Sequence, residues 1–323
     1  MHVVFCASAN FFQHVAVAVT SLSTYSSDEE LVVHVVSCDG SVNDEKRLRD
    51  CLSLIKNCEL NIYIVSDNNI KHLFFDSRIT KESYLRILVP NILPQSLRRV
   101  LYLDCDIVVL DDVRPLWTHD LGGKVMGAVP DFMMQVSGQP RGPAYVNAGV
   151  LLIDLEKWRE MNLTEKMLEY AAEHREYLEY HDQDVINSVL YGKMDNLDLR
   201  WNVHAAVYRY SRRGLGAMRV KLDSARKRPA ILHYTGVQKP WLFRSEAPKR
   251  AAYYRFLRRT RWRADPPNLV QPINRIEHQL DCLFILFGVD IRETGRQIRI
   301  IPGRLVRLII RSFRRTLKHQ HHS

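Results

Sequence analysis

The sequence predicts an α/β protein built on a doubly wound, mostly parallel sheet. Hydrophobic residues make up 46% of the 323 residues, which is enough for a large core. Up to residue 106, short apolar runs alternate with segments of helical spacing. The runs are almost continuously apolar, as in strands buried on both faces of a parallel sheet. Repeated strand–helix units favour a doubly wound sheet, which binds ligands beyond the carboxyl ends of its strands.

The expected elements follow from these patterns in chain order. Strands are expected in the apolar runs at 2–8, 31–38, 60–66, 99–106, 124–130, 145–155 and 230–233. Helices are expected at 11–25, 43–57, 156–179 and 182–191, where the spacing or the polar face is helical. The segments 130–144 and 236–248 contain Gly and Pro, and we expect them to form loops over a site.

The excess of basic residues lies at the C-terminal end of the chain. The net charge is +10, yet residues 249–323 hold 17 Lys and Arg against 5 Asp and Glu, whereas residues 1–248 hold 29 against 31. We therefore expect two parts, an α/β domain at 1–247 and a basic, mainly helical, amphipathic region at 248–323. Because the charge forms a terminal module, the sequence argues against a nucleic-acid-binding protein.

A helix at 304–318 would carry basic residues on one side and aliphatic residues on the other. Such a helix lies in the headgroup plane of an anionic membrane, where each basic group contributes about 1 kcal/mol. The alternative is a solvated helix that docks its apolar stripe on the α/β domain. No apolar run approaches the roughly 18–20 residues that span a bilayer, and no targeting segment is evident. The six cysteines form no C-x-x-C pair, which favours a reducing compartment. We expect a cytoplasmic protein that attaches to a membrane surface.

Two carboxylates, Asp104 and Asp106, interrupt an apolar run at 99–110. Burying an unpaired carboxylate costs several kcal/mol or forces its protonation. The pair is tolerable at a strand end where a cation neutralises both groups, and their hard oxygen ligands suit Mg²⁺ or Mn²⁺. A cation that bridges them to a diphosphate would neutralise a departing leaving group. The alternative is a strand-end turn with two solvated aspartates, because Asp-x-Asp is a short motif.

A second polar segment, 233–241, follows the apolar run at 230–232. His233 at the end of this run could supply a third metal ligand, since imidazole binds Mn²⁺. Gly236 would let the backbone approach a phosphate closely, and Lys239 would supply a point charge for it. The alternative is a turn that follows a core histidine.

Polar groups at 147 and 181–184 could contact a sugar. Asp182 and Gln183 stand just before an apolar helical segment, where they could bind sugar hydroxyls or could form an N-capping cluster. Asn147 could orient a hydroxyl beside the small residues Ala148 and Gly149. The alternative for Asn147 is a plain strand with small residues for packing.

Two further positions could face a nucleotide. Arg86 lies in an apolar helical turn, where an arginine usually keeps its head in water, although it could pair with a carboxylate or a phosphate. The turn at 6–10 follows the first strand, and in a doubly wound sheet this turn faces the nucleotide. Cys6 is expected to be a core residue and not a nucleophile, because no basic partner lies nearby in the sequence.

Six segments between residue 1 and about residue 245 together resemble glycosyltransferase family 8. The resemblance is to the bacterial lipopolysaccharide galactosyl- and glucosyltransferases in particular. The segments occur in consistent order, and they are Phe5-Cys-Ala-Ser-Ala-Asn10, Tyr84-Leu-Arg86, Leu101-Tyr-Leu-Asp104-Cys-Asp106, Asn147-Ala-Gly-Val-Leu-Leu-Ile153, Asp182-Gln-Asp184 and His233-Tyr-Thr-Gly236-Val-Gln-Lys239-Pro-Trp241.

The resemblance implies a GT-A-type nucleotide-sugar fold, Mn²⁺ dependence with Mg²⁺ as the alternative, and retention of the anomeric configuration. The resemblance also implies that the metal ligands are Asp104, Asp106 and His233. It places these residues around the UDP: Ala7, Ser8, Asn10, Arg86, Asp104, Gly236 and Lys239. It places Asn147, Asp182 and Gln183 around the transferred sugar. Gln183 would lie below the anomeric carbon. Ser8 stands where some members have an aspartate, and it could still hydrogen-bond to uracil.

The expected reaction is transfer of glucose or galactose from UDP-glucose or UDP-galactose to a saccharide hydroxyl, giving an α-linkage. The resemblance implies a lipid-linked acceptor in the lipopolysaccharide core and a location on the cytoplasmic face of the inner membrane. One alternative is a protein- or self-glycosylating enzyme of the same fold. The other is a non-catalytic peripheral membrane binding protein in which the Asp pair is only structural.

Overall fold

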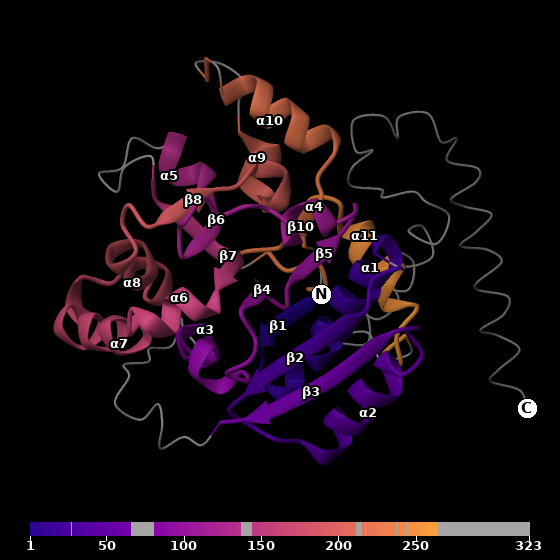
Figure 1. Cartoon of the computed structure of the whole chain (residues 1–323). Coiled ribbons are helices and arrows are strands. Elements are labelled where there is room, and N and C mark those ends of the chain that lie inside the picture. Colours follow the sequence, from indigo (N-terminus) through magenta and orange to yellow (C-terminus); the bar gives the residue numbers. More distant parts are fainter. Residues whose placement is uncertain are drawn as a thin grey trace, which may run out of the picture.

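A seven-stranded sheet forms the centre of the computed structural model (Figure 1). The structure describes residues 1–26, 28–65, 81–136, 144–210, 215–216, 218–236, 238–242 and 245–263. The strands of this sheet are β1 His2–Cys6, β2 Leu31–Ser37, β3 Cys58–Ile64, β4 Arg99–Leu103, β6 Met126–Pro130, β7 Val146–Asp154 and β8 Met194–Asn196. They lie in the order β3-β2-β1-β4-β7-β6-β8. A smaller sheet, in the order β5-β10-β9, contains β5 Ile107–Val109, β10 Ile231–His233 and β9 Val203–His204.

The large sheet is mostly parallel, as the sequence predicts, but it contains one reversed strand. β1 is parallel to β2 and β4, β2 to β3, and β6 to β8, whereas β7 is antiparallel to both of its neighbours. Leu103 at the end of β4 therefore lies opposite Val150 in the middle of β7, and the residues that precede Val150 lie beyond the end of β4. This reversal brings the polar start of β7 to the carboxyl end of β4, where Asp104 follows.

Helices cover both faces of the sheet, as continuously apolar strands require. In β1, Val3 and Phe5 face one core and Val4 and Cys6 face the other. The first core is covered by α1 Phe12–Tyr25, α2 Val42–Leu52 and α11 Arg250–Leu257. The second is covered by α3 Lys81–Ile92, α6 Leu155–Glu160, α7 Leu163–Glu173 and α8 Asp182–Val189. The shorter helices are α4 Arg114–Trp117, α5 Phe132–Val136 and α9 Ala205–Arg209, and α10 Met218–Lys227 also lies outside the main layers.

Two expected elements differ from the structure. The single helix expected at 156–179 is wrong, because α6 ends at Glu160 and α7 begins at Leu163. Between them Asn162 has a φ of 49°, a left-handed conformation that asparagine tolerates better than most residues and that interrupts the helical hydrogen bonds. The expected loop at 130–144 contains the short helix α5, whose Phe132 is buried.

The described part of the expected basic region packs on the α/β domain. α11 lies against α1, and its Tyr253 and Phe256 are buried in the same core. The division at 247/248 stays a prediction, and the helix expected at 304–318 lies outside the described residues. Among the residues that the structure describes, no helix is both long and apolar enough to cross a membrane.

Candidate active site

Asp104, Asp106 and His233 meet where the two sheets adjoin. Asp104 directly follows β4, and Asp106 directly precedes β5. β5 pairs antiparallel with β10, so that Ile107 lies opposite His233, and the backbone N–H of Tyr234 donates to the Asp106 carbonyl at 2.9 Å. The His233 Nε2 atom is 3.4 Å from Asp104 Oδ2 and 3.3 Å from Asp106 Oδ1. One potential ligand atom from each of the three residues lies within 4.8 Å of the other two.

The space around these three side chains depends on Gly149. A Cβ atom at this position would lie 2.2 Å from Cε1 of His233 and 2.8 Å from Oδ2 of Asp104, both well inside contact distance. Two carboxylates and one imidazole form a donor set that suits Mn²⁺ and also admits Mg²⁺. The three residues therefore fit a divalent cation, and Gly149 leaves the space that their side chains occupy.

Gly149→Ala is expected to weaken Mn²⁺ binding by at least about tenfold, because the added methyl group must displace His233 or Asp104 from the cluster. The measurement is a Mn²⁺ titration followed by electron paramagnetic resonance. Gly40→Ala is the matched control, since its Cβ would meet only flexible side-chain ends, the nearest being Glu45 Oε1 at 3.3 Å. Equal Mn²⁺ affinity in Gly149→Ala and the unchanged protein would contradict this geometry.

Arg86 on α3 is buried and holds two carboxylates, so of the possibilities left open by the sequence the structure shows the pairing with carboxylates and not the solvated head group. Its Nη2 lies 3.1 Å from Asp104 Oδ1, its Nε lies 2.9 Å from Asp182 Oδ2, and its Nη1 donates to the Ala148 carbonyl at 2.7 Å. Burial raises the pKa of Asp182 to about 6, although Arg86 opposes this shift. For Asp104, burial acts to raise the pKa, but Arg86 and His233 outweigh it and lower the pKa below its usual value.

Lys239 pairs with the other carboxylate of the cluster. Its ammonium group contacts Asp106 Oδ2 and donates to the Tyr234 carbonyl at 2.9 Å. The turn that brings it there contains Gly236 with a φ of 78°, which favours glycine. Burial opposes the charge on Asp106, yet Lys239 and His233 hold its pKa well below the usual range.

The proposed sugar-contacting residues gather at the start of β7. Gln183 on α8 accepts a hydrogen bond from the Ala148 backbone N–H at 3.0 Å, and its Nε2 lies 3.4 Å from the Tyr145 hydroxyl. Asn147 Oδ1 accepts from the Gly149 backbone N–H at 3.1 Å. The alternative of an N-capping cluster holds in part: His181, the N-cap residue of α8, makes no side-chain capping bond, but Asp184 in the first turn of α8 accepts from the Tyr180 backbone N–H at 2.6 Å.

The turn after β1 lies at the same sheet edge. β1 and β4 are parallel neighbours with Val4 opposite Tyr102, so the turn after β1 and Asp104 both follow carboxyl strand ends. Ala7 is buried, and the Ser8 hydroxyl donates to Asn10 Oδ1 at 2.5 Å. The turn therefore lies at the same edge of the sheet as Asp104, and its role in facing a nucleotide stays a prediction.

Asn202 is a buried residue of the site that the sequence analysis missed. Its Oδ1 lies 2.9 Å from His233 Nδ1, and its Nδ2 donates to Asn147 Oδ1 at 2.8 Å. A hydrogen bond at Nδ1 fixes the tautomer of His233 and leaves Nε2 to face the two carboxylates. The only local signal is an asparagine placed between the apolar residues Trp201 and Val203.

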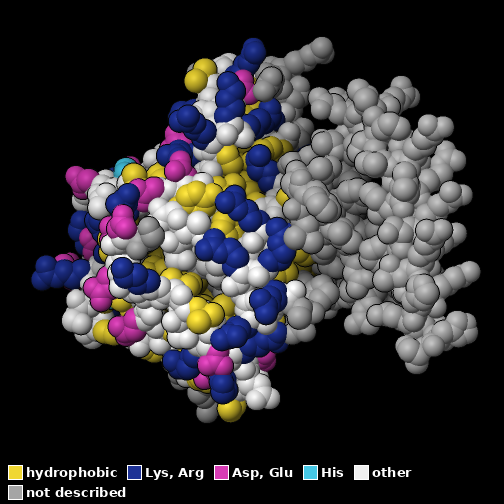
Figure 2. Space-filling model, turned by 90° about the vertical axis from the view of Figure 1, so that its right-hand side faces the viewer, with side chains coloured by type: hydrophobic (Ala, Val, Ile, Leu, Met, Phe, Trp, Pro, Cys, Tyr) yellow, Lys and Arg dark blue, Asp and Glu magenta, His cyan; other side chains and the backbone are white. Residues whose placement is uncertain are grey.

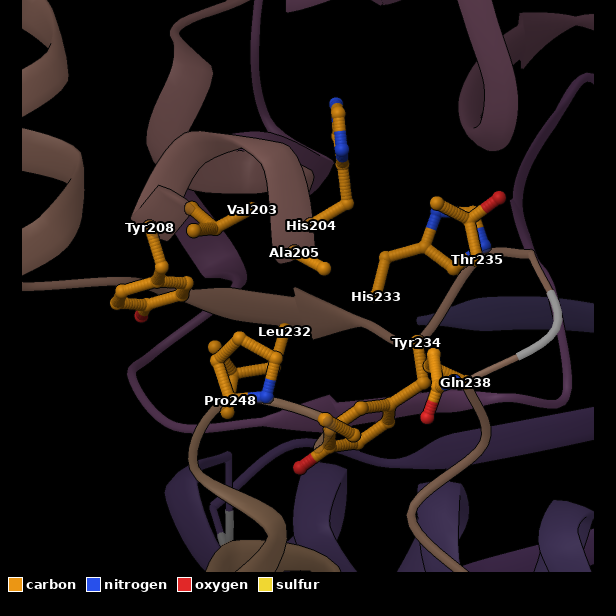
Figure 3. A pocket seen from close by; sticks show the side chains of 11 residues that line it. Val203, His204, Ala205, Tyr208, Leu232, His233, Tyr234, Thr235, Gln238 and Pro248 are labelled. Atoms are coloured by element: carbon orange, nitrogen blue, oxygen red, sulfur yellow. The ribbon is translucent and has the colours of Figure 1, made fainter. Parts of the chain in front are cut away.

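His204 is a second missed residue. It lies opposite His233 in the parallel pairing of β9 and β10, and both line a pocket together with Tyr208 and Thr235 (Figure 3). Its Nε2 is buried and has no hydrogen-bond partner among the described residues, so a water or a ligand hydroxyl is needed to satisfy it. Burial lowers the pKa of His204 to about 4, which keeps the ring neutral.

A model of glycosyl transferase family 8 matches residues 2–245. The chain belongs to this family. General stress protein A of Bacillus subtilis (strain 168) is 32% identical over 272 residues, covering 81% of this chain and 94% of the relative. The lipopolysaccharide 1,2-glucosyltransferase of Escherichia coli (strain K12) is 25% identical over 293 residues, covering 87% of this chain and 85% of the relative.

A solved galactosyltransferase structure has the same fold. The galactosyltransferase LgtC, in complex with donor and acceptor sugar analogs, superposes with a TM-score of 0.69 at 27% identity, covering 82% of this chain and 99% of LgtC. The predicted GT-A fold and the predicted class of enzyme, a family 8 hexosyltransferase, are therefore confirmed. The family match ends at residue 245, before the basic region begins at residue 248.

Proposed function

We propose that this family 8 enzyme transfers galactose or glucose from a UDP-sugar to a saccharide hydroxyl, with Mn²⁺ and with retention of configuration. One observation carries the proposal: a cluster suited to a divalent cation lies beside a half-buried lysine on one side and the polar residues of β7 and α8 on the other. The names of two similar proteins support it, a lipopolysaccharide glucosyltransferase and a galactosyltransferase bound to donor and acceptor analogs.

The residues of the cluster would hold the cation through Asp104, Asp106 and His233. When bound, a divalent cation supplies charge that stabilises the diphosphate leaving group. Lys239 neutralises Asp106 in the structure, and we propose that its ammonium group would also neutralise a bound diphosphate. Arg86 directs its guanidinium at Asp104, Asp182 and the Ala148 carbonyl, so we assign it the positioning of these groups.

The sugar-facing side of the site would act on the anomeric carbon. Gln183 is held by the Ala148 N–H, which places its amide at the start of β7 beside Asn147. We propose that this amide stabilises positive charge at the anomeric carbon, while Asp182 and Asn147 bind sugar hydroxyls. The test is hydrolysis of UDP-glucose and UDP-galactose with and without Mn²⁺. Metal-dependent release of one hexose identifies the donor, whereas no release from either would contradict the proposal.

Metal binding is expected to release a proton from His233. Burial lowers the pKa of this imidazole, but Asp106 and Asp104 raise it to about 9. The ring must lose that proton before its nitrogen can bind a metal. Below pH 9 the apparent Mn²⁺ affinity should therefore rise with pH, by up to about tenfold per pH unit. Calorimetry in two buffers of different ionisation enthalpy measures the released proton. An affinity that stays flat from about pH 6.5 to 8.5 would show that His233 is not a ligand.

We also propose that the acceptor is lipid-linked, in the lipopolysaccharide core, and that the basic region holds the enzyme on an anionic, cytoplasmic membrane surface. Residues 249–263 add seven Lys and Arg and no Asp or Glu. On the face that bears α11 and α1, Lys and Arg side chains outnumber Asp and Glu (Figure 2). Clustered basic groups next to a surface of anionic lipids attract it by about 1 kcal/mol each.

Co-sedimentation with anionic liposomes tests this membrane proposal. The full chain is expected to bind at low salt and to be released at high salt. A chain that ends at Arg263 keeps the whole described domain, so it should bind more weakly and still hydrolyse the UDP-sugar at the same rate. Equal binding by both chains would contradict an anchor in residues 264–323. Mass spectrometry of the glycosylated product separates a lipid-linked acceptor from a protein acceptor.

A further inference from the structure

The hollow between α7 and α8 is lined by aromatic rings that remain exposed. Tyr177 and Tyr191 are 81% and 75% exposed, although burying a tyrosine ring is normally favourable. Both line a cavity of about 380 Å³ together with Tyr145, Tyr170, His174 and Ser188. Small-molecule sites typically have volumes of roughly 300–1,000 Å³ and few, well-placed polar groups. We call this the tyrosine cavity.

Two of the rings that line this cavity stack on each other. Tyr170 near the C-terminal end of α7 and His174, its C-cap residue, lie with their centroids 4.0 Å apart and their planes 13° from parallel. His174 is held in place through its Nδ1, which lies 3.1 Å from the Tyr170 carbonyl oxygen. An aromatic ring face with a hydroxyl or a ring nitrogen at its edge matches a pyranose. The ring C–H groups of the sugar can lie on the face, and its hydroxyls can reach the edge.

The charges around the cavity exclude an anionic occupant. Among the described residues no Lys or Arg lines it, and the segment 165–179 contains five Glu against Lys166 and Arg175. The one lining carboxylate, Asp184, accepts hydrogen bonds from the Tyr145 hydroxyl at 2.5 Å and from the Tyr180 backbone N–H at 2.6 Å. Phosphates and anionic lipid headgroups are therefore disfavoured, and the carboxylate is already satisfied within the protein. An uncharged, hydroxylated ligand suits this lining.

The tyrosine cavity shares a wall with the sugar site. The hydroxyl of Tyr145, a lining residue, lies 3.4 Å from Nε2 of Gln183, and Gln183 Oε1 accepts from the Ala148 N–H. Asn187 also lines the cavity and fixes the start of β7, because it accepts from Val146 N and donates to Val146 O. A saccharide that reaches the transfer site from this side would pass over α8.

We propose that the tyrosine cavity binds an uncharged pyranose unit of the acceptor saccharide, remote from the hydroxyl that receives the hexose. This inference rests on the proposed glycosyl transfer and adds a second binding site to it. The cavity would select acceptors of more than one sugar residue, and it would contribute to acceptor binding and not to the chemical step.

The test compares binding of an oligosaccharide by the unchanged protein and three double variants in the presence of UDP. The probe is the core oligosaccharide freed from lipopolysaccharide by mild acid, followed by saturation-transfer NMR. Tyr177→Ala with Tyr191→Ala is expected to weaken its binding by about tenfold, and the corresponding double Phe variant should retain it, because the faces of the rings remain. Leu54→Ala with Val220→Ala is the matched control, since these two side chains are 67% and 74% exposed elsewhere.

Metal-dependent hydrolysis of the UDP-sugar is measured on the same proteins and is expected to be unchanged. If that hydrolysis is absent from the unchanged protein, the proposed function fails. If hydrolysis is present but the double Ala variant binds the oligosaccharide as well as the control does, the tyrosine cavity is not an acceptor site. Absence of saturation transfer from the unchanged protein to the oligosaccharide would also overturn the inference. So would a double Ala variant that loses liposome binding and keeps oligosaccharide binding.

Discussion

Asp106→Asn is expected to lower the turnover of a saturating UDP-hexose by at least about 10²-fold, as happens when one preorganised electrostatic group is removed. Asp106 is the carboxylate that both His233 and Lys239 contact, so its charge is central to the cluster. The asparagine has the same shape and can still accept from Lys239, so the fold should be retained. The measurements are turnover with saturating Mn²⁺ and the far-ultraviolet circular dichroism spectrum.

Asp50→Asn is the control for this experiment. Asp50 pairs with Lys46 on the exposed face of α2, and such surface pairs contribute little to stability. We expect that variant to have unchanged turnover. An Asp106→Asn enzyme that kept full activity in the presence of a chelator would contradict the assignment of Asp106 as a metal ligand.

Gln183→Ala is expected to reduce turnover by at least about tenfold while changing the affinity for UDP by less than about twofold. We expect this split because Gln183 lies with Asn147 at the start of β7, whereas other groups would bind the diphosphate. Those groups are Lys239 and the cluster of Asp104, Asp106 and His233. Turnover at saturating donor and a separate UDP binding titration measure the two effects. Gln95→Ala, at an exposed turn, is the matched control. A collapse of UDP affinity with normal turnover at saturation would assign Gln183 to the nucleotide and not to the sugar.

Much of the fold could be predicted because burial on both faces leaves a direct trace in the sequence. The continuously apolar runs gave the positions of β1, β2 and β4 within a few residues. The direction of β7 could not be predicted in this way, since an apolar run is the same in either direction. Its reversal is nevertheless what brings Gly149 against Asp104, with the Asp104 N–H donating to the Gly149 carbonyl at 2.9 Å.

The candidate site was predictable where a residue type was unusual for its surroundings. Asp104 and Asp106 interrupt an apolar run, and a buried charge needs a partner. Asn202 acts on His233 and Asn147 through hydrogen bonds from a distant segment, and no local pattern reveals such contacts. Arg86 was ambiguous for the same reason, because both of its carboxylate partners lie outside α3. The break at Asn162 depends on one backbone angle, which periodicity does not report.

The central claim is that Asp104, Asp106 and His233 together hold one divalent cation that serves UDP-sugar cleavage. Electron paramagnetic resonance of Mn²⁺ titrated into the full chain, with and without UDP, tests it most directly. We expect one Mn²⁺ per chain, bound more tightly with UDP present because the diphosphate supplies further oxygen ligands. The Asp104→Asn, Asp106→Asn double variant should lose this binding in both conditions. Undiminished Mn²⁺ binding by the double variant, or no effect of UDP on the unchanged protein, would contradict the claim.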